Sequence, residues 1–195
     1  MTQKEVLEIF QKCSALLSGH YRLSSGLHSG KYLQCALVLQ YPNLAEKLCN
    51  QLASKFKLHG LKVDAVVSPA IGGIIVGQEV AKALGCRALF CEREEGKMKL
   101  RRGFTIGKGE KIVIVEDVIT TGGSVKEIVR IVNSTGGKVE GIGAIVDRSQ
   151  PSLSHELANL NLSLKSLLKM NIETYSPQEC PICKRGVPLE KPGSR

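Results

Sequence analysis

Apolar residues near the start of the chain recur at the spacing of an amphipathic helix. The positions that set this spacing lie within 2–17 and are Val6, Leu7, Phe10, Cys13, Leu16 and Leu17. A Gly- and Ser-rich stretch follows at 21–34. A second helix is predicted to begin near Pro42, since Pro is favoured in the first turn, and to run to about Leu58.

Further along, short apolar runs alternate with helical patterns. The predicted elements are a strand at 63–67, a helix at 73–84, a strand at 87–91, a loop at 93–110, a strand at 111–116, a helix at 124–135 and a strand at 139–147. Several of these strands are uniformly apolar, which predicts a mostly parallel sheet with helices on both faces. After residue 147 the alternation weakens. The stretch 161–172 fits a last strand or a short helix, and an irregular tail is expected from Ser176.

Length and composition narrow the class of protein. The chain has 195 residues, enough for one α/β domain spanning 1–195. We expect a cytoplasmic protein without a membrane segment, because no apolar run reaches the ~18 residues of a membrane helix and the start lacks a signal-peptide layout. Seven irregularly spaced cysteines favour reduced thiols. The net charge of +9 fits an anionic small substrate, and with only 4% aromatic residues nucleic-acid binding is not expected.

The most informative segment is IVIVEDVITTGGS at 112–124. Its β-branched run predicts a buried strand that ends in the adjacent carboxylates Glu116 and Asp117. A loop of Thr, Gly and Ser then opens into a helix, where hydroxyls and backbone N–H groups can bind a phosphate dianion. Because the acids would repel that phosphate, they are expected to bind the vicinal hydroxyls of a sugar. The alternative is an ordinary turn capped by Ser124 or Thr121; a Walker-type nucleotide loop is disfavoured, since its Gly-Lys pattern is missing.

This segment resembles the binding signature for phosphoribosyl pyrophosphate (PRPP) in type I phosphoribosyltransferases. The resemblance implies the fold of that family, an α/β fold with a central, mostly parallel sheet flanked by helices. It also implies a small N-terminal hood over 1–40 and a flexible active-site lid over 93–110. The implied PRPP-binding residues are Glu116, Asp117, Val118, Ile119, Thr120, Thr121, Gly122, Gly123 and Ser124.

Three further segments resemble those of the orotate-specific branch of the family. LSSGLHSGKYLQ at 23–34 is similar to its substrate motif, and SPAIGGIIVG at 68–77 to its pyrophosphate loop. The similarity of the first segment implies that Ser25 and Tyr32 bind substrate. The third segment, AIVDRSQ at 144–150, resembles the strand end whose Arg binds the carboxylate of the base, and that residue is Arg148 here. The implied reaction transfers phosphoribose from PRPP to orotate, with Mg²⁺ held by substrate oxygens and not by a protein cage. A purine-type transferase and a PRPP-sensing regulator remain alternatives.

The basic cluster in 93–110 supplies the candidate lid chemistry. The resemblance implies that Lys97 is the catalytic residue that contacts the leaving pyrophosphate, with Lys99 and Arg93 in support. The implied catalytic residues are thus Lys97, Lys99 and Asp117. The resemblance also implies a homodimer in which the lid closes over the neighbouring subunit. A solvated basic surface is the alternative interpretation of this cluster.

Three positions depart from the better-studied members of the family. Ser24, Gly72 and Glu94 stand where those enzymes have basic residues. We expect the lost positive charge near PRPP to be replaced from within the lid, by Lys97, Lys99, Arg101 or Arg102.

The pair Cys180 and Cys183 has the spacing of half a zinc site, but no second pair follows it. A complete site would need Cys91 or a partner chain, and a disulfide or two plain thiols are the other possibilities. No protein-held metal is therefore predicted. His28, alone in a Ser/Gly loop, is expected to be a hydrogen-bonding residue and not a catalytic one.

Overall fold

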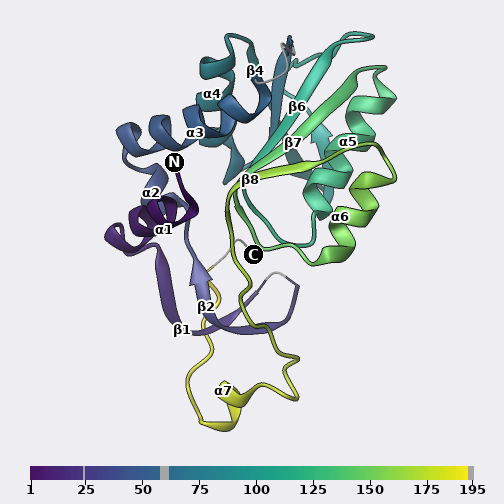
Figure 1. Cartoon of the computed structure of the whole chain (residues 1–195). Helices are drawn as coiled ribbons and strands as arrows, with labels where there is room; N and C mark the ends of the chain where they lie inside the picture. Colours follow the sequence, from purple (N-terminus) through teal and green to yellow (C-terminus); the bar gives the residue numbers. More distant parts are fainter. Residues whose placement is uncertain (24, 58–61, 193–195) are drawn as a thin grey trace.

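The computed structural model describes residues 1–23, 25–57 and 62–192. A six-stranded sheet in the order β5-β4-β3-β6-β7-β8 forms its centre (Figure 1). Its strands are β3 (Ala65–Pro69), β4 (Arg87–Glu94), β5 (Lys97–Leu100), β6 (Lys111–Ile119), β7 (Lys138–Asp147) and β8 (Leu164–Lys169). All neighbouring pairs are parallel except β4 and β5. The prediction of a mostly parallel α/β sheet is confirmed.

Helices cover both faces of this sheet. On one face lie α1 (Gln3–Lys12), α3 (Pro42–Lys57) and α4 (Gly73–Leu84), packed against alternate residues of the strands such as Val113 and Val115. On the other face lie α5 (Gly123–Ser134) and α6 (Pro151–Ala158), packed against residues such as Ile112 and Ile114. Consecutive strand residues point to opposite faces, so the apolar run of β6 is buried on both sides.

The first helix is shorter than predicted. Thr2 and Glu5 form a capping box at its start, and after Lys12 the chain leaves the helix at Ser14, whose φ is 51°. The prediction of helix to residue 17 is wrong, because Leu16 and Leu17 begin strand β1 (Leu16–Arg22). This strand pairs antiparallel with β2 (His28–Leu33) inside the stretch that the sequence showed only as Gly- and Ser-rich.

The predicted loop 93–110 is partly wrong, since it begins with a β-hairpin. Strands β4 and β5 are joined by Glu95 and Gly96, which both have positive φ, at 52° and 77°. Two such residues match the twist of an antiparallel pair and make a tight two-residue turn. Met98 on β5 is buried while Lys97 is exposed, so the short strand keeps one apolar and one polar face.

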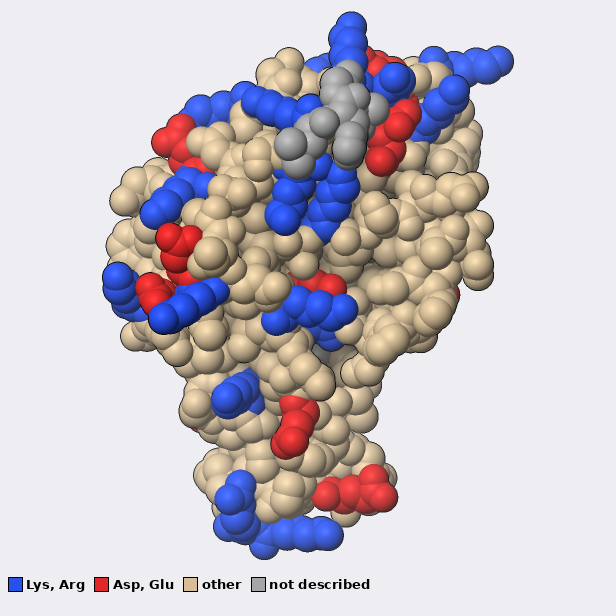
Figure 2. All heavy atoms as spheres, viewed as in Figure 1, with Lys and Arg blue, Asp and Glu red and all other residues tan. Residues whose placement is uncertain are grey.

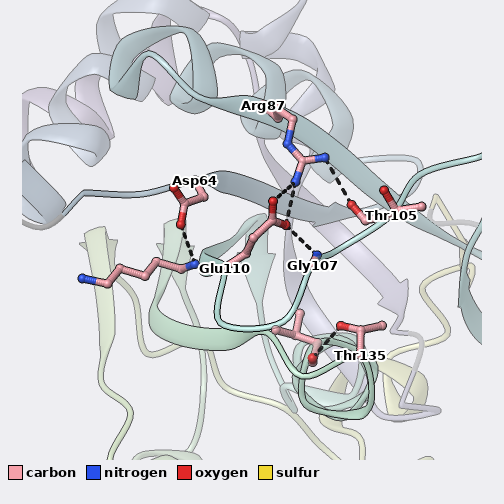
Figure 3. A network of polar contacts seen from close by, with 8 residues as sticks. Asp64, Arg87, Thr105, Gly107, Glu110 and Thr135 are labelled. Carbon is pink, nitrogen blue, oxygen red and sulfur yellow. Dashed lines mark hydrogen bonds and ion pairs between the residues drawn. The ribbon is translucent and has the colours of Figure 1, made fainter.

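The end of the 93–110 segment is fixed to the body of the sheet (Figure 3). Arg87, the first residue of β4, binds both carboxylate oxygens of Glu110 at 2.7 Å and the carbonyl of Thr105 at 3.2 Å. Glu110 also accepts a hydrogen bond from the N–H of Gly107 at 2.9 Å. These contacts lie where the parallel strands begin, so only the hairpin part of the segment extends toward their carboxyl ends.

The later part of the chain contains more regular structure than predicted. The stretch 161–172 contains β8 and is a strand and not a helix, and α6 is an additional helix. The tail contains one short helix, α7 (Pro181–Lys184). Another short helix, α2 (Ala36–Leu39), links β2 to α3. In Figure 1 the β1–β2 hairpin and α7 together project from one side of the sheet domain.

The tail runs against the hairpin. Backbone hydrogen bonds join His28 to Tyr175 and Arg22 to Glu190, and Ser29 Oγ donates to the carbonyl of Glu173. A small N-terminal hood is therefore present, and the chain after residue 172 is part of it. None of the helices in the described ranges is long and apolar enough to span a membrane.

Positive charge is spread widely over the surface. On the face in Figure 2, Lys and Arg side chains lie most densely at the end of the molecule opposite the hood. Lys57 at the end of α3, Lys111 at the start of β6 and Lys138 at the start of β7 are all exposed. The charge excess is thus not confined to the basic cluster of the hairpin.

Candidate active site

Glu116 and Asp117 lie in the last part of β6, at the carboxyl edge of the sheet, where ligands of such folds bind. Burial, together with the neighbouring charge of Asp117, raises the pKa of Glu116 to about 8. Burial also raises the pKa of Asp117, opposed by the backbone N–H groups of Val118 and of Asp117 itself. Within the described ranges, neither carboxylate has a Lys or Arg nitrogen within 4.0 Å. The two acids are therefore available to hydroxyl groups of a ligand.

The candidate phosphate loop follows directly. Thr120 and Thr121 are exposed, and Gly123 and Ser124 form the first turn of α5. No side chain of the described part of the chain caps this helix, so its first N–H groups are free to donate to an anion. Gly122 is required because its φ is +70° and because a Cβ there would lie 2.5 Å from Leu153 Cδ1.

Val118 and Ile119 were predicted together with the loop, but both belong to β6. The Ile119 side chain is buried in the core beneath α5 and α6. Its carbonyl accepts the N–H of Arg148 at 2.8 Å. The loop proper thus begins at Thr120, and Ile119 contributes to the site by fixing Arg148.

Arg148 follows the last residue of β7 and lies beside the strand tip of β6 through that hydrogen bond. Its Nε is buried and has no hydrogen-bond partner among the described residues. Burial lowers the pKa of Arg148, opposed by the nearby Tyr32 and Cys35. The pKa of Tyr32 is raised by burial and by the charge of Asp117. Tyr32 is therefore within electrostatic reach of both Arg148 and Asp117, all three of which the sequence predicted as site residues, and of Cys35, which it missed.

The loop at the end of β3 closes this edge from another side. It contains a cis peptide bond between Ala70 and Ile71, and Ile71 is exposed. A Cβ on Gly72 would lie 2.8 Å from Asp117 Oδ2. Glycine at this position, where better-studied relatives have a basic residue, is thus explained by the Asp117 carboxylate, which occupies the space a side chain would need.

The basic residues of the hairpin are mostly paired with acids. Glu94, the residue that departs from the family pattern, accepts Lys99 at 2.5 Å and Arg101 at 3.0 Å. Glu92 binds Arg102 at 2.7 Å. Three of the four cations expected to replace the lost charge are therefore neutralised locally. Lys97 is exposed and, among the described residues, has no carboxylate within 4.0 Å.

Arg93 is also engaged. Its guanidinium pairs with Glu127 of α5 at 2.7 Å and donates to the carbonyl of Gly96 at 2.6 Å. Glu127 in turn accepts the N–H of Met98 at 3.1 Å. This arrangement holds the hairpin against α5, and sequence reasoning missed Glu127 because it lies on a helix distant in the chain.

Ser25 is not brought to the strand tips by any described contact. It is exposed in the turn between β1 and β2, next to Ser24, which lies outside the described residues. His28 is buried and lies against His20 and the tail. These polar contacts fit the hydrogen-bonding role expected of it and not a catalytic one.

A hollow of about 520 Å³ lies elsewhere, between β5 and α5. Among the predicted site residues, Lys99 lines it.

Comparison with known proteins identifies the family. The family described as the phosphoribosyl transferase domain matches residues 38–156. The orotate phosphoribosyltransferases of Caldanaerobacter subterraneus subsp. tengcongensis and Desulforamulus reducens are 53% and 52% identical to this chain, over 100% of it and 99% and 98% of their own lengths.

A solved structure shares the fold. The orotate phosphoribosyltransferase of Aeropyrum pernix superimposes with a TM-score of 0.71 at 24% identity, covering 85% of this chain and 93% of that one. Together with the acidic strand tip, the uncapped helix start and the half-buried Arg148 beside them, these similarities show that the chain belongs to the phosphoribosyltransferase family, among the orotate phosphoribosyltransferases.

Proposed function

We propose that the protein transfers the 5-phosphoribosyl group of PRPP to orotate, giving orotidine 5′-monophosphate and pyrophosphate. The observation that carries this proposal is the hydrogen bond from the Arg148 N–H to the Ile119 carbonyl. It places the backbone of Arg148, whose side-chain Nε is buried and has no partner among the described residues, beside the strand that carries Glu116 and Asp117. A carboxylate acceptor and a sugar phosphate donor would then bind at adjacent strand ends.

The donor half of the site consists of the β6 tip and the start of α5. Glu116 and Asp117 accept hydrogen bonds from the two ribose hydroxyls through carboxyl oxygens that have no Lys or Arg partner among the described residues. The 5′-phosphate binds the N–H groups and hydroxyls of Thr120 to Ser124, where the helix dipole favours an anion. The acids thus orient the sugar and do not act as a general acid or base.

The acceptor half centres on Arg148 and Tyr32. A guanidinium presents two parallel N–H donors to a carboxylate, and its partial desolvation strengthens such a pair. Orotate has this carboxylate on its ring, whereas purine bases do not. A carboxylate bound by Arg148 would place the acceptor ring beside a ribose bound at the β6 tip, and proximity would supply much of the rate.

The leaving pyrophosphate needs positive charge near the strand tips. Lys97 is the hairpin cation best suited, because Lys99, Arg101 and Arg102 are paired with Glu92 and Glu94. We assign Lys97 to contact pyrophosphate as it departs, with Lys99 and Arg93 in support once their present pairs open.

The residues at the strand tip fit Mg²⁺ bound chiefly through substrate oxygens. Glu116 and Asp117 are carboxylates without a cationic partner, and hard oxygen ligands of this kind suit the ion. They would be the protein groups nearest to it. When bound, Mg²⁺ would offset the negative charge of the pyrophosphate.

A homodimer in the cytoplasm completes the proposal. The β4–β5 hairpin carries Lys97 at an exposed position, and the Arg93–Glu127 contact holds this hairpin against α5 of its own chain. A neighbouring subunit would bring such a hairpin over this active site. The cysteines of the described residues are all free thiols, which supports a reducing compartment.

Two alternatives are disfavoured by specific residues. A purine base has no carboxylate to pair with the guanidinium of Arg148, so a purine-type transferase would not need this residue. A PRPP-sensing regulator would not need the exposed Lys97 on a hairpin beside the site.

One assay distinguishes these functions. The protein is incubated with PRPP and Mg²⁺, and the consumption of orotate is compared with that of adenine, hypoxanthine and uracil. We expect orotate to be consumed fastest, with release of one pyrophosphate per product. Equal or faster consumption of another base would contradict the proposal.

A further inference from the structure

Four potential metal ligands meet where the hairpin and the tail touch. His20 lies on β1, His28 begins β2, Cys180 precedes α7 and Cys183 lies within it. One ligand atom from each lies within 4.8 Å of all the others. His20, His28 and Cys180 are buried, and Cys183 is exposed. The two residues that the C-x₂-C pair lacked in the sequence are thus supplied by histidines about 150 residues earlier.

The distances between these atoms suit a tetrahedral site. With Zn–N bonds of about 2.0 Å and Zn–S bonds of about 2.3 Å, neighbouring ligand atoms lie roughly 3.3 to 3.8 Å apart. His20 Nε2 lies 3.1 Å from His28 Nδ1 and 3.5 Å from the sulfur of each cysteine. His28 Nδ1 lies 3.2 Å from Cys183 Sγ. The two remaining distances are at most 4.8 Å, so shifts of about 1 Å or less would place all four atoms around one ion.

Hydrogen bonding alone accounts poorly for this cluster. His20 Nδ1 lies 2.8 Å from the Val187 carbonyl, which can only accept, so Nδ1 carries a proton. In a neutral imidazole the lone pair is then on Nε2, directed at the cluster. That single lone pair faces three groups, His28 Nδ1, Cys180 Sγ and Cys183 Sγ. A histidine ligand whose second nitrogen donates to a backbone carbonyl is the usual arrangement at protein metal sites.

We propose that His20, His28, Cys180 and Cys183 bind a structural Zn²⁺ ion that fastens the tail to the β1–β2 hairpin. Two thiolates and two imidazoles in tetrahedral geometry favour zinc, and four protein ligands leave no open position for catalysis. Binding releases the two thiol protons to solvent.

The ion would act on the substrate segment indirectly. The hairpin that supplies His20 and His28 also carries Ser25 in its turn and Tyr32 near its end. A two-stranded hairpin has little stability of its own, so a metal link to the tail would hold it in place over the strand tips. Ile182 packs against this hairpin too, since a Cβ on Gly30 would lie 3.3 Å from its side chain.

The first test measures metal directly in the full chain. The protein is purified without chelators from cells grown with zinc, and zinc is quantified by inductively coupled plasma mass spectrometry. We expect close to one zinc per chain. Cys183→Ser should lower this to below about one fifth, while Cys86→Ser, a partly buried cysteine outside the cluster, should leave it unchanged. Less than about one tenth of an equivalent in the unaltered protein would overturn the proposal, as would an unchanged value in Cys183→Ser.

A second test covers the case in which Cys183→Ser folds poorly. The unaltered protein is stripped under reducing conditions and titrated with Co²⁺, whose tetrahedral thiolate complexes absorb strongly in the visible range. We expect saturation at one equivalent and reversal by Zn²⁺. Absence of these bands, or a Cys180–Cys183 disulfide found by mass spectrometry in the freshly reduced and zinc-supplied protein, would refute the site. Neither readout uses orotate, so a failure of the proposed activity would not affect it.

Discussion

Replacing Glu116 with Gln should make the ligand-free protein more resistant to urea at alkaline pH. The pKa of Glu116 is raised from its ordinary value of 4.5 to about 8, chiefly by burial and then by the charge of Asp117. Below pH 4.5 the carboxyl is neutral in both the folded and the unfolded chain. Between pH 4.5 and 8 only the unfolded chain ionises, so the free energy of unfolding falls as pH rises. Gln has nearly the same shape as Glu and does not ionise, so the free energy of unfolding of the variant should not fall with pH in this way.

The magnitude follows from the width of that pH interval. At about 1.4 kcal/mol per pH unit, the interval sets a ceiling of about 5 kcal/mol at pH 8.5. Glu116 retains some contact with water, which weakens the effect, so we expect about 2 to 3 kcal/mol. With a urea dependence of about 2 kcal/mol per molar, the unfolding midpoint should rise by about 1 to 1.5 M.

The assay is urea unfolding followed by circular dichroism at pH 5.0, 7.0 and 8.5, without substrates or Mg²⁺. The matched control is Glu127→Gln. Hydrogen bonding to Arg93 lowers the pKa of Glu127, so its carboxylate stabilises the fold above pH 4.5, and its loss should cost about 0.5 to 1 kcal/mol at pH 8.5.

The two variants should therefore move in opposite directions. A stability difference between Glu116→Gln and the unaltered protein that stays the same at pH 5.0 and 8.5 would refute the argument. It would mean that Glu116 is ionised in the folded chain at low pH, with a compensating partner at the strand tip.

Three further predictions concern the site and its support. Lys97→Ala should lower kcat about a hundredfold while the orotate Kd measured by calorimetry stays within about twofold; an unchanged kcat would remove its role. Arg148→Lys should raise the KM for orotate about tenfold or more and leave that for PRPP nearly unchanged, because Lys cannot bind a carboxylate through two parallel N–H groups; a parallel rise in both would contradict the assignment. Gly122→Ala should lower the free energy of unfolding by about 1.5 to 3 kcal/mol through its positive φ and its contact with Leu153, whereas Gly123→Ala, 3.7 Å from its nearest neighbour, should cost less than about 1 kcal/mol; equal losses would argue against the close approach.

The sheet and its helices could be predicted because their patterns are local. The run from Ile112 to Val115 is buried on both faces, and a run without alternation is the signature of that environment. The predicted helix at 73–84 has the bounds of α4. It ends just before Gly85, whose φ of +70° is typical of the residue that follows a helix.

The hood was harder to predict from the sequence, because its secondary structure depends on contacts between residues far apart in the chain. Leu16 and Leu17 fit the spacing of the first helix, and only the turn at Ser14 and the pairing with β2 decide that they are strand residues. The hairpin at β5 was missed although Met98 and Leu100 alternate with lysines, since four residues are too few to distinguish a strand from a charged loop.

The candidate site also has parts that local sequence predicts and parts that depend on distant contacts. Glu116 and Asp117 could be located because strand, acids and loop are contiguous. The partners of Lys99 and Arg101 could not, because Glu94 lies on the opposite strand of a hairpin that the sequence did not reveal. Similarly, the sequence offered only Cys91 or a partner chain as further ligands for Cys180 and Cys183, whereas the histidines that meet this pair are on β1 and β2.

The backbone bonds between hairpin and tail impose an order on assembly. His28 pairs with Tyr175 and Arg22 with Glu190, so the second strand of each contact is synthesised after all six strands of the sheet. A nascent chain folds from its N-terminal side, and the hairpin alone is marginal. The phosphate-binding half of the protein can therefore form during translation, while the half that receives the base stays open until the tail emerges. The newly made enzyme would acquire its two substrate sites in sequence, donor before acceptor.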